Sequence, residues 1–434
     1  MSDKLEKRDI TLGGSKRYSV ADGVSIKSKR SNDEWGVFNE DWGFRIWDIP
    51  EEFRTGKKYK NFILAQEEEE KQELTLESMP YQIDIEPTNI CNLQCPLCST
   101  GVGANTRKKG MMEYEKFKIL VDEIKDTVVQ LSLQNWGEST LVPSFPKMIQ
   151  YAAKAGIFMR LSTNFSVDYD KEYFYEFITS GLGRLVIDLD GTTQEVYEKY
   201  RKNGKLDTVL RNIESAVKVK KDNNLKYPII QARMLVMKHN EHQIEEFRKI
   251  SENLEVDEIE LGNIQMNPNT AAEQWLPKNK KFVYKTYLNE RRITPCHWPW
   301  SGMVINWEGG VSPCSIVDDQ NSDFGNVFSN GGIKKVWNNE FYISARSVFS
   351  PNKKITKRTI CGVCKNDTHN PKLLRVGDSF SLTLNKDVEL RTYMTRNEFL
   401  SQFHHLRQTY SEPDFPLRKT GRPAAVLIPL IDYG

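Results

Sequence analysis

Residues 90–99 read I-C-N-L-Q-C-P-L-C-S and place Cys91, Cys95 and Cys98 at C-x3-C-x2-C. Three thiolates this close together can cap three irons of one cubane cluster and leave the fourth iron without a protein ligand. The residues just before them, 81–87, alternate isoleucine with polar side chains and predict a short strand. The cysteines are therefore expected on a loop just past the carboxyl end of a strand, where barrel enzymes place their active sites.

The alternative for this triplet is a structural or zinc-binding role. Zinc prefers four ligands, often in paired C-x2-C spacings. One triplet does not supply that set, so the spacing favours a cluster with an open iron.

At these residues the sequence resembles the radical SAM superfamily, whose signature has an apolar residue before the last cysteine, here Leu97. The resemblance implies a [4Fe-4S] cluster whose open iron chelates the amino and carboxylate groups of S-adenosylmethionine (SAM). It also implies reductive cleavage of SAM to a 5'-deoxyadenosyl radical, with an electron donor such as flavodoxin or ferredoxin as a partner.

Composition limits the class of protein. The 434 residues are 38% hydrophobic and 28% charged, which is typical of a cytoplasmic globular protein of two or three domains. A net charge of +2 gives no basic field for nucleic acid. No apolar run approaches the ~20 residues of a membrane helix, and the N-terminus lacks the apolar core of a secretory signal. Seven cysteines, an odd number, favour reduced thiols that hold metal over a disulfide framework.

The two ends of the chain are less regular. Residues 1–80 are expected to form an N-terminal extension, disordered over 1–33. Its aromatic segment, Trp35 to Phe62, is expected to pack on the next domain, with a lid over the substrate as the alternative. The acidic run 67–73 predicts a solvated helix or linker. Residues 371–434 are expected to form a C-terminal extension with one helix at 397–410.

From residue 82 onward, apolar periodicities of strand and helix alternate. After the strand at 82, the helices are expected at 114–125, 145–155, 172–179, 207–220 and 243–253, and the strands at 128–133, 157–161, 185–189, 229–237 and 258–261. Such alternation builds a parallel sheet with right-handed crossovers. The fold class is therefore α/β, with a partial (β/α)6 barrel of radical SAM type over 81–290. It is expected to be open at one side for substrate.

Polar residues follow the second and third strands. Gly137 and Glu138 resemble the G-G-E region of the family, which binds the amino group of SAM, with Trp136 in place of the first glycine. Asn164, in the segment S-T-N, resembles a family segment that lines the cofactor pocket. A surface turn at 137–138 and an ordinary Asx turn at Asn164 are the alternatives.

The end of the fourth strand carries Asp188 and Asp190, followed by Arg201. This region resembles the S-x-D-G…Y-x-x-x-R segment of the SPASM and twitch subgroup. The resemblance implies that Asp188, which replaces serine, contacts the cofactor and that Arg201 pairs with the cofactor carboxylate. Asp188 and Arg233 are the candidate catalytic residues, because both are expected to face the barrel interior, where an acid can act as a base. For Asp190, a place in the turn before a helix capped by Thr192 is equally open.

A second cysteine set comprises Cys296, Cys314, Cys361 and Cys364. Four thiolates can cap all four irons of one cubane or hold one zinc, and the residues leave both open. The flanking sequence resembles SPASM/twitch domains. It implies a small domain over 291–370 in the shorter twitch form with one auxiliary [4Fe-4S] cluster.

The two sets use every cysteine, so a fully ligated auxiliary cluster is expected to conduct electrons. The layout resembles twitch-bearing aminocyclitol dehydrogenases, which favours an oxidoreductase that oxidises a small polyol or sugar. The alternatives are a radical SAM maturase of peptides or an epimerase, and a non-catalytic scaffold with zinc in both sets. Residues 1–80 show no recognisable peptide-binding domain, and no spare cysteine remains as a hydrogen donor.

Overall fold

The computed structural model describes residues 49–265, 272–283, 296–350 and 355–364. All of them belong to one compact unit, Met1–Gly377. The predicted disorder of 1–33, the aromatic residues before 49 and the predicted C-terminal helix at 397–410 lie outside the described residues.

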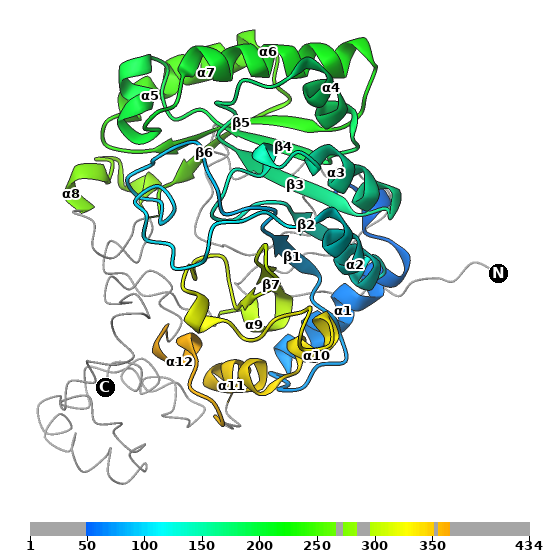
Figure 1. The fold of residues 1–434 in the computed structure, drawn as a ribbon. Helices are drawn as coiled ribbons and strands as arrows, with labels where there is room; N and C mark the ends of the chain where they lie inside the picture. Colours follow the sequence, from blue (N-terminus) through cyan, green and yellow to red (C-terminus); the bar gives the residue numbers. More distant parts are fainter. Residues whose placement is uncertain (1–48, 266–271, 284–295, 351–354, 365–434) are drawn as a thin grey trace, which may run out of the picture. The chain divides into compact units, whose positions relative to one another are not determined.

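One sheet runs through the described part of the chain (Figure 1). Its strand order is β6-β5-β4-β3-β2-β1-β7-β8. Neighbouring strands from β1 to β6 pair in parallel, as predicted. The strands are β1 (Gln82–Ile85), β2 (Gln130–Ser132), β3 (Phe158–Thr163), β4 (Arg184–Asp188), β5 (Ile229–Val236), β6 (Glu258–Asn263), β7 (Gly302–Ile305) and β8 (Val311–Ser312).

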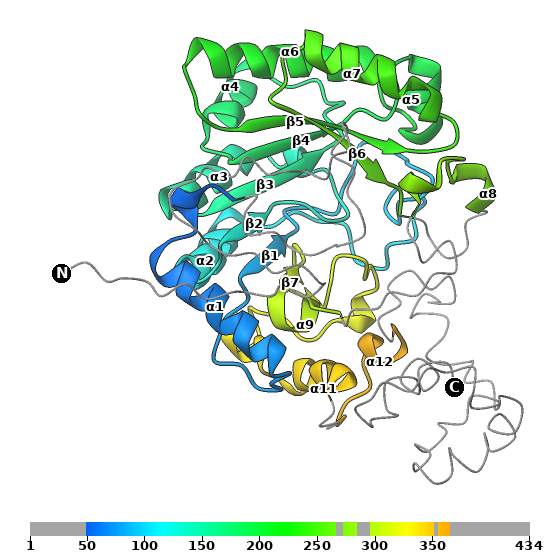
Figure 2. The same ribbon diagram turned by 180° about the vertical axis from the view of Figure 1, so that it is seen from behind.

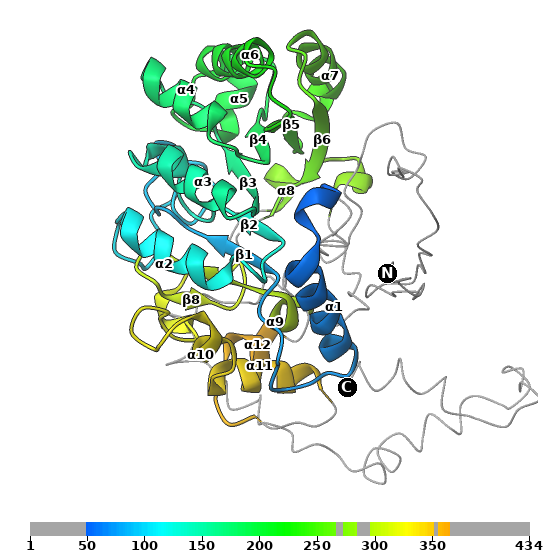
Figure 3. The same cartoon turned by 90° about the vertical axis from the view of Figure 1, so that its right-hand side faces the viewer.

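The crossover helices cover one face of this sheet, as Figure 3 shows for α2 to α4. They are α2 (Tyr114–Ile124), α3 (Phe145–Lys154), α4 (Lys171–Thr179), α6 (Leu206–Asp222) and α7 (Ile244–Asn253). Each buries one apolar stripe. On α2 the stripe is Phe117, Leu120, Val121 and Ile124. A further short helix, α5 (Gln194–Tyr200), was not predicted, because its apolar side chains are too few to show a period.

Side-chain alternation along the strands separates an apolar face from a polar one. On β3, Met159 and Leu161 join the core beneath the helices. Arg160 and Ser162 therefore turn to the other face, which is the interior of the partial barrel. The sequence thus places charged side chains inside the barrel and apolar side chains against the helices.

The segment before the barrel forms α1 (Gly56–Glu70), which lies beside β1 and α9 in Figure 2. Phe62 of α1 packs with Tyr81, Val129 and Phe158, residues that stand at or just before the first residues of β1, β2 and β3. The described aromatic residues therefore close the amino end of the barrel. For the described part of the segment, residues 49–62, this confirms the packing prediction, whereas the aromatic residues before 49 lie outside the described residues.

The acidic run at the end of α1 is only partly solvated, which corrects the prediction. Glu68 is buried, and its carboxylate accepts hydrogen bonds from the backbone nitrogens of Glu77, at 2.6 Å, and Ser78. Burial raises the pKa of the neighbouring Glu69 to about 7. The acids of this run therefore anchor the loop that leads into β1.

The C-terminal region continues the same sheet. β7 pairs in parallel with β1, and β8 returns antiparallel beside β7 through a turn in which Gly309 has a φ of +92°. Around this hairpin lie α9 (Trp298–Ser301), α10 (Ile333–Trp337), α11 (Glu340–Phe349) and α12 (Ile360–Cys364). The small cysteine-rich domain predicted over 291–370 is continuous with the barrel in its described residues, because β7 pairs directly with β1. Among the described helices, none is long and apolar enough to cross a membrane.

Glu69→Gln should change stability in a pH-dependent way. The carboxyl of Glu69 is held neutral in the fold up to about pH 7, whereas the ordinary pKa of a glutamate is 4.5. Stability is therefore lost as pH rises from about 4.5 to about 7. The glutamine variant should raise the free energy of unfolding by about 1–2 kcal/mol at pH 8 and leave it unchanged at pH 4. Urea denaturation measures both values.

The matched control is Glu70→Gln, because Glu70 is exposed on the same helix. An equal gain at pH 4 and pH 8 would contradict the titration of Glu69.

Candidate functional site

The three cysteines of the first set lie together on the loop that follows β1. Cys95 is buried, and Cys91 and Cys98 are half-buried. A tight turn, with the Cys98 nitrogen donating to the Cys95 carbonyl at 3.1 Å, brings their thiols to one side. The three cysteines pack with the apolar residues that follow β5 and β6. The predicted position at the carboxyl end of β1 is confirmed.

The surroundings of these thiols favour a bound cation. Burial raises the pKa of Cys91 to about 12, and Glu138, Cys95 and Cys98 raise it further. Burial likewise raises the pKa of Cys95 to about 11, although Arg201 opposes the shift. Thiols such as those of Cys91 and Cys95, which resist ionisation alone, become thiolates when a cationic metal group neutralises them. This donor set fits the three capped irons of one cluster.

Glu138 links the ends of β2 and β3. It is buried, and its carboxylate accepts from the Thr163 hydroxyl at 2.8 Å, the Asn164 backbone nitrogen at 2.9 Å and the Thr140 hydroxyl at 2.7 Å. Burial raises its pKa, and these hydrogen bonds oppose the shift. Its own backbone nitrogen donates to the Ile90 carbonyl at 2.8 Å, so the carboxylate stands beside the cysteine loop.

Gly137 has a different reason to be glycine from the one predicted. A Cβ at this position would lie 1.9 Å from the Thr88 carbonyl oxygen, so the cysteine loop itself fills the space. Trp136, which replaces the first glycine of the family pattern, points toward the C-terminal region. Its Nε1 lies 3.4 Å from the Val317 carbonyl, and its backbone nitrogen donates to Glu86.

Asn164 contacts the cysteine loop from the end of β3. Its Nδ2 lies 3.8 Å from the Cys91 Sγ and donates to Asn92 Oδ1 at 3.0 Å. Its Oδ1 accepts from the Ser166 nitrogen at 2.8 Å, which is the predicted Asx turn. The Asn164 side chain therefore both forms the turn and contacts the cysteine loop.

Asp188, at the end of β4, neutralises two arginines. Its Oδ1 accepts from Arg233 Nε at 2.7 Å, and its Oδ2 lies 3.1 Å from Arg201 Nη2. Burial would raise its pKa, but Arg233 and Arg201 outweigh burial and hold it below the usual range. Arg201 also has Nη1 4.0 Å from Cys95 Sγ. The structure thus joins Asp188, Arg233 and Arg201 to the first cysteine set.

Asp190 is fully buried next to this group. Its Oδ2 accepts from Arg201 Nε at 2.6 Å, and its Oδ1 accepts from the Leu235 backbone nitrogen at 2.7 Å. Burial raises its pKa, with Arg201 opposing and Asp188 adding to the shift. The cap of the following helix is Thr193 and not Thr192, since the Thr193 side chain accepts from the Val196 nitrogen.

Sequence reasoning missed part of the barrel interior. Asp84 of β1 and Arg160 of β3 face inward, and Glu260 of β6 acts on Arg160 electrostatically. Burial raises the pKa of Asp84 to about 6. Burial and the nearby Arg233 lower the pKa of Arg160 to about 10. On each of these strands a charged residue stands between two apolar neighbours. Because side chains alternate between the two faces of a strand, this pattern alone could have placed the charged residue inside the barrel.

The four cysteines of the second set also converge. Cys296 precedes α9, Cys314 follows β8, and Cys361 and Cys364 lie on α12. Burial raises the pKa of Cys314 to about 12, with Cys296 adding to the shift. Burial raises the pKa of Cys361, and the charges of the other three cysteines add to the shift. Four thiols from three segments fit the ligand set of one fully ligated cluster.

Neither cysteine set is arranged around a single metal ion. Within the described ranges, no three side chains of His, Cys, Asp or Glu, those of the two cysteine sets included, lie close enough together to hold one. The second set also faces the barrel, because Asp84 on β1 is close enough to raise the pKa of Cys314.

Two family models match the chain. Residues 85–250 match the radical SAM superfamily, and residues 296–366 match SPASM, described as an iron-sulfur cluster-binding domain. The second match includes all four cysteines of the second set.

Curated relatives match over more than half of the chain. A PqqA peptide cyclase of Bradyrhizobium diazoefficiens is 24% identical over 304 residues, which cover 62% of this chain and 76% of the relative. The mycofactocin maturase MftC of Mycobacterium tuberculosis is 23% identical over 311 residues, which cover 66% and 75%. Among solved structures, SuiB of Streptococcus suis bound to S-adenosylmethionine has a TM-score of 0.53 at 16% identity, over 69% of this chain and 74% of that one. The SuiB likeness shows the fold.

Asp188→Asn should destabilise the protein, because it leaves Arg201 and Arg233 without their shared counter-charge. We expect the free energy of unfolding of the metal-free protein to fall by about 3 kcal/mol in urea denaturation. The control is Asp222→Asn, an exposed acid that pairs with Lys218 on α6. A loss no greater than that of the control would show that Asp188 does not neutralise the two arginines.

Glu138→Gln should weaken SAM binding, because an amide cannot balance the positive amino group. We expect the dissociation constant of SAM to rise about tenfold or more in anaerobic titration calorimetry. The exposed Glu172→Gln on α4 is the control and should bind SAM like the parent. Unchanged affinity in Glu138→Gln would remove Glu138 from the cofactor site.

Proposed function

Because the chain belongs to the radical SAM superfamily and carries a SPASM domain, we propose that it is a maturase that modifies a peptide. As a radical SAM enzyme it uses S-adenosylmethionine and a [4Fe-4S] cluster, and the SPASM domain carries auxiliary iron-sulfur. Bound together, these groups supply a carbon-centred radical that removes a substrate hydrogen.

The observation that carries the proposal is the kind of relative that aligns over more than half of the chain. The PqqA peptide cyclase and the mycofactocin maturase MftC match over 62% and 66% of this chain, and their names describe a cyclase of a peptide and a maturase. Oxidation of a polyol or sugar, the first hypothesis from the sequence, rested on cysteine layout alone. The relatives favour the alternative, a peptide substrate.

We assign the cofactor contacts to Glu138, Arg201 and Asn164, and a positioning role to Asp188. Glu138 receives the amino group of SAM, and Arg201 faces its carboxylate beside Cys95. Asn164 supports the pocket through its contact with Cys91. Asp188 acts by holding Arg201 and Arg233 in place, which is a positioning role and differs from the base predicted for it, because its carboxylate is already paired with both arginines.

The substrate side chain is proposed to enter the barrel interior. Asp84 and Arg160 lie on neighbouring parts of this surface, with Ser132 between them in the strand register. Arg233 reaches the same space from β5. These polar and charged groups favour a side chain that forms hydrogen bonds over a purely apolar one. An electron donor such as flavodoxin or ferredoxin completes the proposed set of partners.

The test is to co-express the enzyme with each short peptide encoded beside its gene and to weigh the peptides. A cross-link or oxidation removes two hydrogens per modification, and each event should accompany one 5'-deoxyadenosine. The control is the variant Cys91→Ala/Cys95→Ala/Cys98→Ala, which should leave every peptide unchanged.

Peptides whose mass is unchanged in ordinary water, but which gain one carbon-bound deuterium in heavy water, would indicate epimerisation instead. Unmodified peptides together with an oxidised polyol would contradict the proposal.

A further inference from the structure

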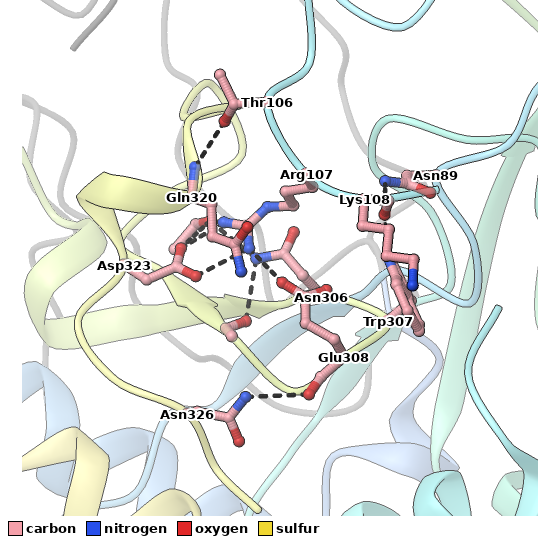
Figure 4. A network of polar contacts seen from close by, with 12 residues as sticks. Asn89, Thr106, Arg107, Lys108, Asn306, Trp307, Glu308, Gln320, Asp323 and Asn326 are labelled. Carbon is pink, nitrogen blue, oxygen red and sulfur yellow. Dashed lines mark hydrogen bonds and ion pairs between the residues drawn. The ribbon is translucent and has the colours of Figure 1, made fainter. Parts of the chain in front are cut away.

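Residues 99–111, here called the strap, run from the first cysteine set toward α2. Figure 4 shows Thr106, Arg107 and Lys108 of the strap beside residues of the SPASM region. We propose that Arg107, at the centre of the strap, is a positioning residue that sets the SAM-binding half of the site against the SPASM domain. The inference rests on the assignment of Glu138 to SAM and is independent of what the substrate is.

Arg107 is held entirely by the SPASM region. Its side chain is 0% exposed. Nη1 pairs with Glu308 and lies 2.8 Å from Asp323 Oδ2. Nη2 pairs with the other oxygen of Asp323 and donates to Ser312 Oγ at 3.0 Å. The guanidinium therefore contacts three parts of the SPASM region, namely the turn between β7 and β8, strand β8 itself and the loop after it.

Other strap residues, which precede Arg107 in the sequence, contact the same region. Thr106 Oγ1 donates to Asp319 Oδ1 at 3.0 Å and accepts from the Gln320 nitrogen at 3.0 Å. Ser99, the residue after Cys98, is bonded to Asp318. The strap is thus fixed to the loop that follows Cys314.

Trp307 connects the SPASM residues around Arg107 to the backbone of the strap. Its Nε1 donates to the Lys108 carbonyl at 3.0 Å. A Cβ on Gly110 would lie 2.4 Å from the Trp307 ring, so glycine is required for this contact. The Lys108 carbonyl also accepts from Asn89 Nδ2 at 3.0 Å, which carries the contact to the residues just before Cys91.

The final contacts reach the cofactor residue. The Thr88 hydroxyl donates to the Gly110 carbonyl at 2.7 Å and accepts from the Ile90 nitrogen at 3.0 Å. The Ile90 carbonyl accepts from the Glu138 nitrogen at 2.8 Å. An unbroken series of hydrogen bonds therefore runs from Trp307 and the strap to the backbone of Glu138.

Charge makes Arg107 the decisive member of the strap. It is a single cation among two paired acids, and it opposes the raised pKa that burial gives Asp323. Without the guanidinium, Glu308 and Asp323 would repel each other in a poorly solvated space. The two acids would move away from the strap. The hydrogen bonds that connect the strap to Thr88 and to the backbone of Glu138 would then be distorted.

The experiment compares SAM binding and amide hydrogen exchange in the anaerobically reconstituted full chain and its Arg107→Met variant. We expect the dissociation constant of SAM to rise about tenfold. Exchange should quicken in residues 86–92 and 134–140 as well as in the strap. Arg107→Lys keeps the positive charge but loses the paired N–H donors of the guanidinium, so it should restore part of the affinity for SAM.

Trp307→Phe provides a second variant that removes one partly exposed hydrogen bond and should fold even if Arg107→Met does not. It should weaken SAM binding in the same direction by about threefold. The control is Arg248→Met, since Arg248 also pairs with two acids, Glu245 and Glu252, but on the surface of α7.

SAM affinity equal to the parent in Trp307→Phe, or in folded Arg107→Met, with faster exchange confined to 99–111 and 306–323, would overturn the proposal. Arg107 would then only hold the fold. The calorimetry of Glu138→Gln separates this outcome from a wrong assignment of Glu138.

Discussion

The parallel pairing of β1 with both β2 and β7 is the constraint on which the site depends. β1 ends at Ile85, and the first cysteine set follows within a few residues. β7 and its hairpin partner β8 then deliver Cys314 to the edge of the same sheet. Since strand spacing and register are fixed by backbone hydrogen bonds, the two cysteine sets are held at a set separation. Asp84, on β1 itself, is close enough to Cys314 to raise its pKa.

Buried charge distinguishes the interior of this barrel. Asp188, Arg201, Arg233 and Asp190 form one group, in which each arginine contacts at least one carboxylate. Arg107 with Glu308 and Asp323 forms a second group at the SPASM region. Buried ion pairs add little net stability but cost a great deal when one partner is removed. The two groups matter here because they set positions. The first holds Arg201 beside Cys95, and the second holds the strap against the SPASM region.

Much of the barrel was predictable, because its helices and strands carry clear apolar periods. The strand at 229–237 and the helix at 207–220 were placed within two residues of β5 and α6. β7 was missed because its pairing with β1 joins residues far apart in the sequence, which no local pattern encodes. The cysteines and the strand-end residues were found by motif. The partners of Asp188 and Arg107 were not, since ion pairs between distant segments depend on the completed fold.

The most direct test of the account is the metal content of the anaerobically reconstituted chain and two variants. The account predicts about eight irons in the parent. It predicts about four in the variant Cys91→Ala/Cys95→Ala/Cys98→Ala, and about four in Cys361→Ala/Cys364→Ala. A parent with about four irons and one zinc, the zinc being lost only in Cys361→Ala/Cys364→Ala, would contradict two iron-sulfur sites on one sheet.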